Sequence, residues 1–260
     1  MLIKSLLSYL FTAQNQHGLH SPFVYDLYSK TIRKDNSEPV FESILGVRTA
    51  MFGSRRSIQI TDFGAGSKVN QATVRDVRDI ARHSEKPPRL GRLFYRLIQR
   101  FEHKTIFDLG TSLGLTTLYL ASANDSSRVI TFEGCPQTAA IANANFEQLN
   151  LKNIETVIGN IDKTLPQQVA DCEAIDFAFF DANHRYEPTI RYFETCLEKA
   201  HEGSLFVFDD IHWSHEMEAA WQVIKAHPSV TVTIDLLWVG LVFFKKTQPK
   251  QDFTLRFGLW

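Results

Sequence analysis

The sequence from Thr105 onward alternates between β-prone runs and helical stretches, and this alternation restricts the fold more than any other feature. The β-prone runs, each followed by a helical stretch, are TIFDL, RVITFE, IETVIG, AIDFAFFD and GSLFVFDD. Two of the segments, AFF and LFVF, lack polar alternation, which is typical of central strands that are buried on both sides. Strands that alternate with helices predict a parallel sheet covered by helices on both faces.

The final part of this region, VTVTIDLLWVGLVFFKK, has a different pattern. It holds two β-prone runs separated by only a few residues around 237–240. A parallel pair would need a crossover helix between its strands, and none fits here, so we expect a hairpin with an antiparallel last strand. The predicted fold class is α/β, with a sheet of seven strands that is mostly parallel and ends in this antiparallel strand.

Residues 1–88 are less regular and predict a mostly helical accessory region. Their start could be mistaken for a signal peptide, but its apolar residues, including Leu2, Leu6 and Leu10, recur at helical spacing. We therefore expect an amphipathic helix that docks on the rest of the chain or on a partner. The predicted division is an accessory region at 1–88, a main domain at 89–246 and a tail at 247–260.

The composition restricts the partners and the compartment. The chain has 260 residues and a formal net charge of −1, so no strong overall field would attract nucleic acid or a membrane surface. No apolar stretch reaches the roughly 20 residues that a membrane-spanning helix needs. Cys135, Cys172 and Cys196 show no paired spacing, which favours free thiols in a reducing compartment. We therefore expect a cytoplasmic protein with neither nucleic acid nor membrane as a partner.

Two glycine-rich loops compete for the role of a cofactor site. The second loop, in TIFDLGTSLGLTT, follows a predicted strand and contains Asp108, Gly110 and Gly114, and the next strand ends in the acid Glu133. A glycine loop followed by an acid-ended strand is the arrangement that binds a nucleotide ribose in open α/β sheets. The first loop, in ITDFGAGSKVNQ, has no such strand after it and lacks the order of a phosphate-binding P-loop. We expect it to be a structural turn or a wall of the substrate pocket.

The spacing of the second loop distinguishes between cofactors. Dinucleotide sites use G-x-G-x-x-G, whereas DLGTSLG has two glycines four apart and no third. Together with Glu133 and the terminal hairpin, this loop resembles the Rossmann-like arrangement of class I S-adenosylmethionine-dependent methyltransferases. In that family an acid after the third strand often contacts the adenine, and Asn160 and Asp162 lie there, although both could instead cap the next helix. The expected cofactor-binding residues are Asp108, Gly110, Thr111, Ser112, Gly114, Thr116, Glu133, Asn160, Asp162 and Asp181.

Acidic residues end the fourth and fifth strands, in FFDANHRYEP and FVFDDIHW. Asp181, Asp209 and Asp210 should meet at the same edge of a parallel sheet, although they are distant in sequence. Three carboxylates suit a hard divalent cation such as Mg²⁺ or Ca²⁺ better than zinc. The alternative is that these acids cap helices and bind backbone amides.

The same segments carry a closer resemblance. LGTSLGLTTLYLA resembles the opening motif of the catechol O-methyltransferase group, and DANHRYE and FDDIH are similar to motifs of metal-dependent sugar and natural-product O-methyltransferases, including the macrocin-type enzymes. In the catechol group an acid and a later Asp-Asn pair bind Mg²⁺, which implies Asp181, Asp209 and Asp210 as metal ligands. The resemblance also implies that His184, three residues after the first acid, is the general base. His212 is the second candidate for this base.

These observations predict a metal-assisted, S-adenosylmethionine-dependent O-methyltransferase that acts on a small hydroxylated molecule. They leave the oligomeric state open, with a homodimer as one possibility. Tyr186 and Trp213 could line the acceptor pocket, but packing explains them equally well. A nicotinamide-dependent oxidoreductase is an alternative that the glycine spacing disfavours. A non-catalytic cofactor-binding scaffold, which docks a partner through its N-terminal segment, is a second alternative.

Overall fold

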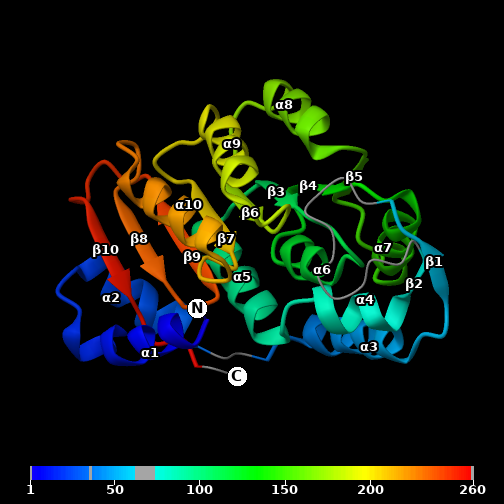
Figure 1. The fold of residues 1–260 in the computed structure, drawn as a ribbon, viewed down its shortest axis with the longest axis horizontal. Coiled ribbons are helices and arrows are strands. Elements are labelled where there is room, and N and C mark those ends of the chain that lie inside the picture. The colour runs from blue at the N-terminus through cyan, green and yellow to red at the C-terminus, as the bar shows by residue number, and fades with distance from the viewer. Residues whose placement is uncertain (1, 35–36, 62–73, 259–260) are drawn as a thin grey trace. The chain divides into compact units, whose positions relative to one another are not determined.

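The computed structural model describes residues 2–34, 37–61 and 74–258 (Figure 1). The chain forms two compact units. We call Asp35–Ala170 the central unit, and Met1–Lys34 together with Asp171–Trp260 the terminal unit. The functional regions that we expected from the sequence, with boundaries at 88 and 246, stay a prediction. The first glycine loop, at 62–68, lies outside the described residues.

The central unit contains the first part of the predicted alternation. Its strands β3, β4 and β5 pair in parallel in that order. A helix follows each strand, as the alternation predicts. The elements are β3 (Thr105–Leu109), α6 (Leu115–Ser122), β4 (Arg128–Glu133), α7 (Pro136–Gln148), β5 (Ile154–Ile158) and α8 (Ile161–Asp171).

The accessory elements of the central unit are mostly helical, as expected. They are α3 (Pro39–Gly53), β1 (Ser57–Gln59), β2 (Val74–Asp76), α4 (Val77–Ser84) and α5 (Pro88–Phe101). Strands β1 and β2 pair antiparallel. Helix α5 packs closely on α6, because a Cβ atom at Gly91 would lie 2.2 Å from the ring of Tyr119.

The terminal unit contains the rest of the alternation and the hairpin. Its strands are β6 (Phe177–Phe180), β7 (Leu205–Asp209), β8 (Val232–Asp235), β9 (Val239–Phe243) and β10 (Gln251–Thr254), in the order β10-β8-β9-β7-β6. Strand β9 runs antiparallel to both β7 and β8, which confirms the hairpin. Strand β10 pairs parallel to β8 and lies in the segment that we expected to be only a tail. The polar run QDFT is short and gave no strand signal.

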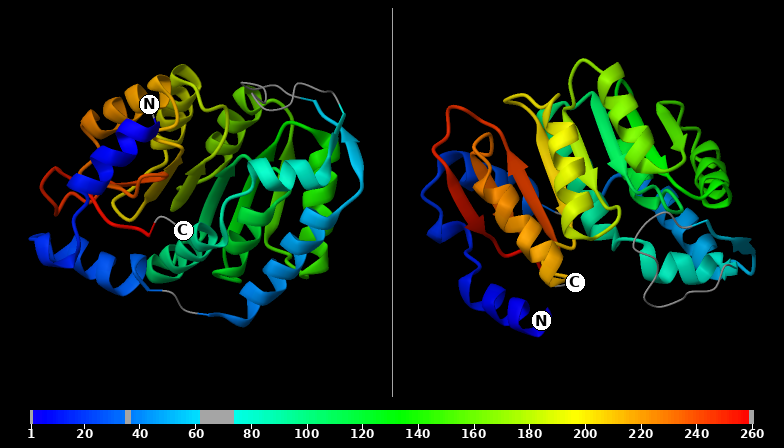
Figure 2. Two further views of the ribbon diagram at one scale, coloured as in Figure 1. Left: turned by 60° about the horizontal axis from the view of Figure 1, so that its bottom comes forward. Right: turned by 45° about the horizontal axis from the view of Figure 1, so that its top comes forward.

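Helices cover both faces of the terminal unit's strands. Helices α9 (Tyr186–Leu197) and α10 (His215–Ala226) pack side by side on one face (Figures 1 and 2). Trp221 of α10 fills the space beside Gly240, where a Cβ atom would lie 2.5 Å from its ring. Phe243, three residues further along β9, instead makes an edge contact with Phe23 of α2 (Pro22–Leu27), with ring centroids 5.2 Å apart. Because successive side chains alternate across a strand, α2 and α10 lie on opposite faces.

The N-terminal helix α1 (Leu2–Thr12) docks within the terminal unit. Of the two expected docking sites, the rest of the chain or a partner, the structure shows the first. The hydroxyl of Tyr9 donates to the carbonyl of Leu255 at 2.6 Å and accepts from the amide of Phe257 at 2.8 Å. Tyr9 packs with Ala13 and Leu237. A short 3₁₀ helix (Gln16–Gly18) and a π-helical turn (Tyr28–Ile32) connect this segment to the rest. No helix in the described ranges is long and apolar enough to cross a membrane.

Candidate functional site

The second glycine loop connects β3 to α6 and requires glycine at both of its predicted positions. Gly110 has a φ of 125° and Gly114 a φ of 81°, values that side chains with a Cβ rarely adopt. A Cβ atom at Gly114 would also lie 2.5 Å from the ring of Phe146 in α7. The backbone of the loop therefore approaches α7 closely. The loop ends at the start of α6, and the N-terminal amides of α6 favour a polar or anionic ligand.

A buried hydroxyl network holds the start of this loop. The carboxylate of Asp108 is fully buried and accepts from the hydroxyls of Thr117 at 2.6 Å and Thr131 at 2.8 Å. The Thr131 hydroxyl also lies 2.5 Å from that of Thr111. These contacts join β3, the loop, α6 and β4. Thr117 and Thr131 were not among the expected site residues, although a buried acid within a strand requires hydrogen-bond donors nearby.

Glu133 contacts the loop through its side chain. One carboxylate oxygen accepts from the amide of Ser112 at 2.9 Å, and the other accepts from the amide of Cys135 at 2.9 Å. Glu133 is half-buried. These two bonds orient the carboxylate at the loop. The structure thus brings Glu133 to the loop, and its role toward the cofactor stays a prediction.

Asn160 and Asp162 lie at the start of α8. The side-chain oxygen of Asn160 accepts from the amide of Asp162 at 2.9 Å, and its carbonyl accepts from the amide of Thr164 at 3.1 Å. The capping role that we considered is therefore formed at Asn160. The preceding Gly159 donates its amide to the carbonyl of Glu133 at 2.9 Å, which places the cap next to the end of β4.

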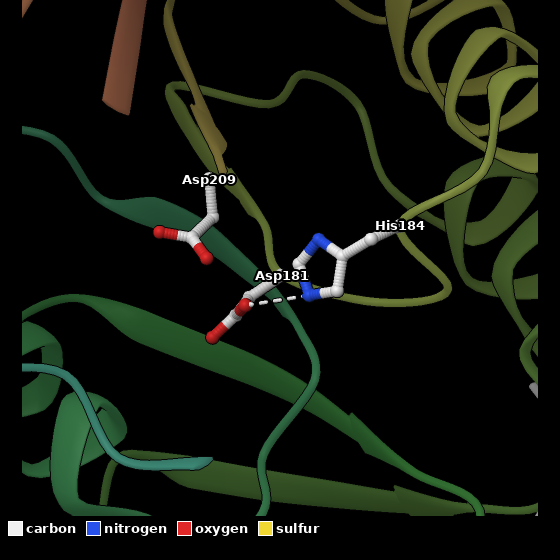
Figure 3. Close-up of side chains that lie close together, drawn as sticks. All are labelled: Asp181, His184 and Asp209. Atoms are coloured by element: carbon white, nitrogen blue, oxygen red, sulfur yellow. Dashed lines mark ion pairs between the residues drawn. The ribbon is translucent and has the colours of Figure 1, made fainter. Parts of the chain in front are cut away.

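The carboxyl ends of β6 and β7 bring a second group of side chains together. Phe180 and Phe208 are register partners on these parallel strands, so the residues that follow them, Asp181 and Asp209, end adjacent strands. Ligand atoms of Asp181, His184 and Asp209 all lie within 4.8 Å of one another (Figure 3). We call these three residues the acidic cluster.

The acidic cluster has the donor chemistry of a divalent cation site. Two carboxylates this close repel each other unless a cation or a proton lies between them. His184 Nε2 lies 3.3 Å from Asp181 Oδ1, and Figure 3 shows the imidazole directed toward this carboxylate. Asp209 is almost completely buried, at 1% exposure, which increases the cost of leaving its charge uncompensated. The two carboxylates suit a hard ion such as Mg²⁺ or Mn²⁺, whereas an imidazole ligand would favour a transition metal such as zinc or iron.

Asp210, the third predicted carboxylate, is not a member of this group among the residues that the structure describes. The backbone of Asp210 has a φ of 53°, so the chain leaves the extended conformation of β7 at this residue. Its carbonyl accepts from the amide of Trp213 at 2.9 Å, which closes a turn. The structure brings His184 into the cluster instead.

His212 is a poor base in this arrangement. Its Nε2 lies 2.8 Å from Asp235 and its Nδ1 lies 3.4 Å from Glu218. Burial lowers the pKa of His212, but the hydrogen bonds and negative charges of Asp235 and Glu218 outweigh it, so the pKa is raised. The raised pKa favours the protonated form of His212, and this form cannot accept a proton. His184 remains the better candidate.

The two aromatic residues near these strand ends differ in their surroundings. Tyr186 begins α9 and its amide donates to Glu216 at 3.3 Å. Trp213 is 47% exposed, which is unusual for tryptophan. Its exposure argues against a packing role, and a role in lining the acceptor pocket stays a prediction.

Comparison with known proteins agrees with this description. Residues 107–211 match the family described as a methyltransferase domain. A catechol O-methyltransferase of Niastella koreensis is 32% identical over 127 residues, which is 48% of this chain and 57% of that protein. The matched segment therefore spans little more than half of this relative.

Solved structures show the same fold. An O-methyltransferase from Bacillus cereus in complex with SAH has a TM-score of 0.56 at 22% identity, covering 84% of this chain and 94% of that one. The O-methyltransferase TomG from Streptomyces achromogenes, in complex with SAM, has a TM-score of 0.56 at 16% identity, covering 89% and 99%. The Rossmann-like α/β fold, mostly parallel with an antiparallel strand and an N-terminal helical region, is confirmed.

Over residues 107–211 the chain is thus similar to a methyltransferase domain, in agreement with the class I S-adenosylmethionine-dependent methyltransferase resemblance of its glycine loop and terminal hairpin. Within this class it is similar to the catechol-type O-methyltransferases, which confirms the resemblance of its sequence motifs.

Proposed function

We propose that this protein is a metal-assisted, S-adenosylmethionine-dependent O-methyltransferase that acts on a small hydroxylated molecule. The observation that carries the proposal is the acidic cluster, Asp181, His184 and Asp209, at the ends of two adjacent strands. The match of residues 107–211 to a methyltransferase domain supports the transferase class. The relative named a catechol O-methyltransferase supports oxygen as the acceptor atom and a small aromatic diol as the first substrate to test.

In the proposed cofactor site, the second glycine loop binds S-adenosylmethionine. Gly110 and Gly114 allow the close backbone approach, and the amides at the start of α6 face the ligand. Glu133, already oriented by Ser112 and Cys135, accepts hydrogen bonds from the ribose hydroxyls. Asn160 and Asp162 lie next to the end of β4, where an adenine contact is expected from the family resemblance.

In the proposed acceptor site, Asp181 and Asp209 would hold a divalent cation, and His184 would stay free of the cation to act as the base. Such an ion, when bound, stabilises the negative charge that develops on the acceptor oxygen. His184 takes the proton of the acceptor hydroxyl, and Asp181, 3.3 Å away, stabilises the imidazolium that forms. Trp213 supplies an exposed aromatic face for a flat acceptor.

Two experiments test the proposal against its alternatives. Calorimetry with S-adenosylmethionine, S-adenosylhomocysteine and NADH identifies the cofactor, and we expect only the first two to bind. Transfer of labelled methyl from S-adenosylmethionine to a panel of catechols, phenols and sugars, with and without a chelator, then separates an enzyme from a scaffold. Binding of NADH alone would support the oxidoreductase alternative. Cofactor binding without transfer to any acceptor in the panel would support the scaffold.

A further inference from the structure

Leu113 lies in the second glycine loop, which we call the cofactor loop, and both its backbone amide and its backbone carbonyl are bound by side chains from outside the loop. Its amide donates to Glu85 Oε1 at 3.0 Å, and its carbonyl accepts from Asn145 Nδ2 at 2.9 Å. The amide of the preceding residue, Ser112, is bound by Glu133. Two consecutive amides of the loop are therefore bound by carboxylates.

The side chain of Leu113 ties the loop to the accessory elements. It is completely buried. Its hydrophobic cluster includes residues from β1, α4 and α7, namely Ile58, Val77, Ile80, Ala81 and Ile141. The contact at Glu85 is thus part of a larger contact between accessory elements and the cofactor loop.

The loop needs this support because of its backbone. Ser112 has a φ of 50° and Gly114 a φ of 81°, on either side of Leu113. A non-glycine residue in the left-handed region costs of order 1–3 kcal/mol and persists only where its surroundings impose it. Hydrogen bonds from side chains outside the loop to Ser112 and Leu113 therefore determine whether the loop keeps its conformation.

Glu85 is itself held in place. It is the C-cap residue of α4, with extended backbone angles. The next residue, Lys86, accepts through its carbonyl from Arg48 Nη1 of α3 at 2.8 Å. The positive charge of half-buried Arg48 also interacts with the carboxylate of Glu85. The segment from α4 to α5 is thereby attached to α3.

We infer that Glu85 is a positioning residue for cofactor binding. Glu85 holds the loop at Leu113 in the conformation that binds the cofactor. Through Arg48, Glu85 also connects the accessory helices to the cofactor site. This inference rests on the proposed function, because it assumes that the loop binds S-adenosylmethionine.

The test compares Glu85→Ala with Glu85→Gln. The amide oxygen of glutamine can still accept from the Leu113 amide, whereas alanine cannot. We expect Glu85→Ala to raise the Kd for S-adenosylhomocysteine and the KM for S-adenosylmethionine by about tenfold or more, the range for a lost hydrogen bond to a charged group. The kcat at saturating cofactor and the KM of the acceptor should change little, and Glu85→Gln should restore most of the affinity.

Glu155→Ala is the matched control, because Glu155 lies in the same unit and pairs with Arg128 at the surface. It should leave cofactor affinity unchanged. If Glu85→Ala does not fold, Glu85→Asp replaces it, since its shorter side chain reaches the Leu113 amide less well, and it should bind more weakly than Glu85→Gln.

The outcomes separate this inference from the proposed function. If the wild type does not bind S-adenosylhomocysteine, the proposed function fails and the inference fails with it. If the wild type binds, but folded Glu85→Ala, or Glu85→Asp in its place, binds equally well, only the inference is wrong. A variant that lowers the Tm without changing the Kd would show a purely structural role and would also overturn the inference.

Discussion

The backbone conformation of the cofactor loop at Gly114 predicts how much a substitution there lowers the free energy of unfolding. Alanine there must adopt a φ of 81° and place its Cβ atom 2.5 Å from the Phe146 ring. The left-handed backbone costs about 1–2 kcal/mol, and overpacking a well-filled site costs about 1–3 kcal/mol. We expect Gly114→Ala to lower the free energy of unfolding by about 2–5 kcal/mol.

Urea unfolding monitored by circular dichroism measures this change. Gly46→Ala in α3 is the control, because nothing lies within 4 Å of the added Cβ atom. Within a helix, alanine is more favourable than glycine by about 0.5–1 kcal/mol, so the control should be neutral or stabilising. Adding Phe146→Leu to Gly114→Ala should recover part of the packing loss but none of the backbone cost. If Gly114→Ala is no less stable than Gly46→Ala, the described loop geometry is wrong.

Three further predictions concern single side chains. Glu133→Ala should weaken S-adenosylhomocysteine binding by roughly ten- to hundredfold in calorimetry, because a carboxylate that accepts from two hydroxyls is lost; unchanged affinity would point to another ribose anchor. His184→Ala should lower turnover by roughly 10²–10⁴-fold at neutral pH and recover partly at high pH, where the acceptor ionises unaided; a pH-independent defect would argue against a base. The raised pKa of His212 means that its ion pairs stabilise the fold fully below its unfolded pKa and are lost as pH rises through the folded pKa. Thermal unfolding of His212→Gln should therefore show a larger loss at pH 6 than at pH 9, and an equal loss at both would contradict the ion pairs.

The fold could be predicted where local patterns determine it. Alternating runs indicated the parallel strands, and the short gap at 237–240 indicated the hairpin, because no crossover helix fits there. Strand β10 could not be predicted, since QDFT is short and polar and becomes a strand only by pairing with β8. The N-terminal helix was expected to dock, but its anchor, the Tyr9 hydroxyl between Leu255 and Phe257, is a contact between opposite ends of the chain.

The candidate site could be predicted in outline, since the ends of parallel strands meet at one edge. Asp181 and Asp209 followed from that rule. Asp210 was expected in the cluster as well, but its backbone is left-handed, and the pattern of residue types does not indicate this. The contact from Glu85 to the Leu113 amide joins two segments across an intervening helix, and only the folded structure reveals it.

The central claim is that the acidic cluster holds a cation that methyl transfer requires. The most direct test measures labelled methyl transfer to catechol after chelator treatment, as Mg²⁺ is added back, for the wild type and for Asp209→Asn. Asp210→Asn is the matched control, because it removes the same charge one residue further on and creates the amide found in the catechol group.

Chelator should abolish transfer by the wild type, and Mg²⁺ should restore it. Asp209→Asn should stay inactive at every Mg²⁺ concentration while binding S-adenosylhomocysteine as tightly as the wild type, and Asp210→Asn should keep metal-dependent turnover. Transfer that continues at full rate in chelator, or an Asp209→Asn variant as active as the wild type, would contradict the account.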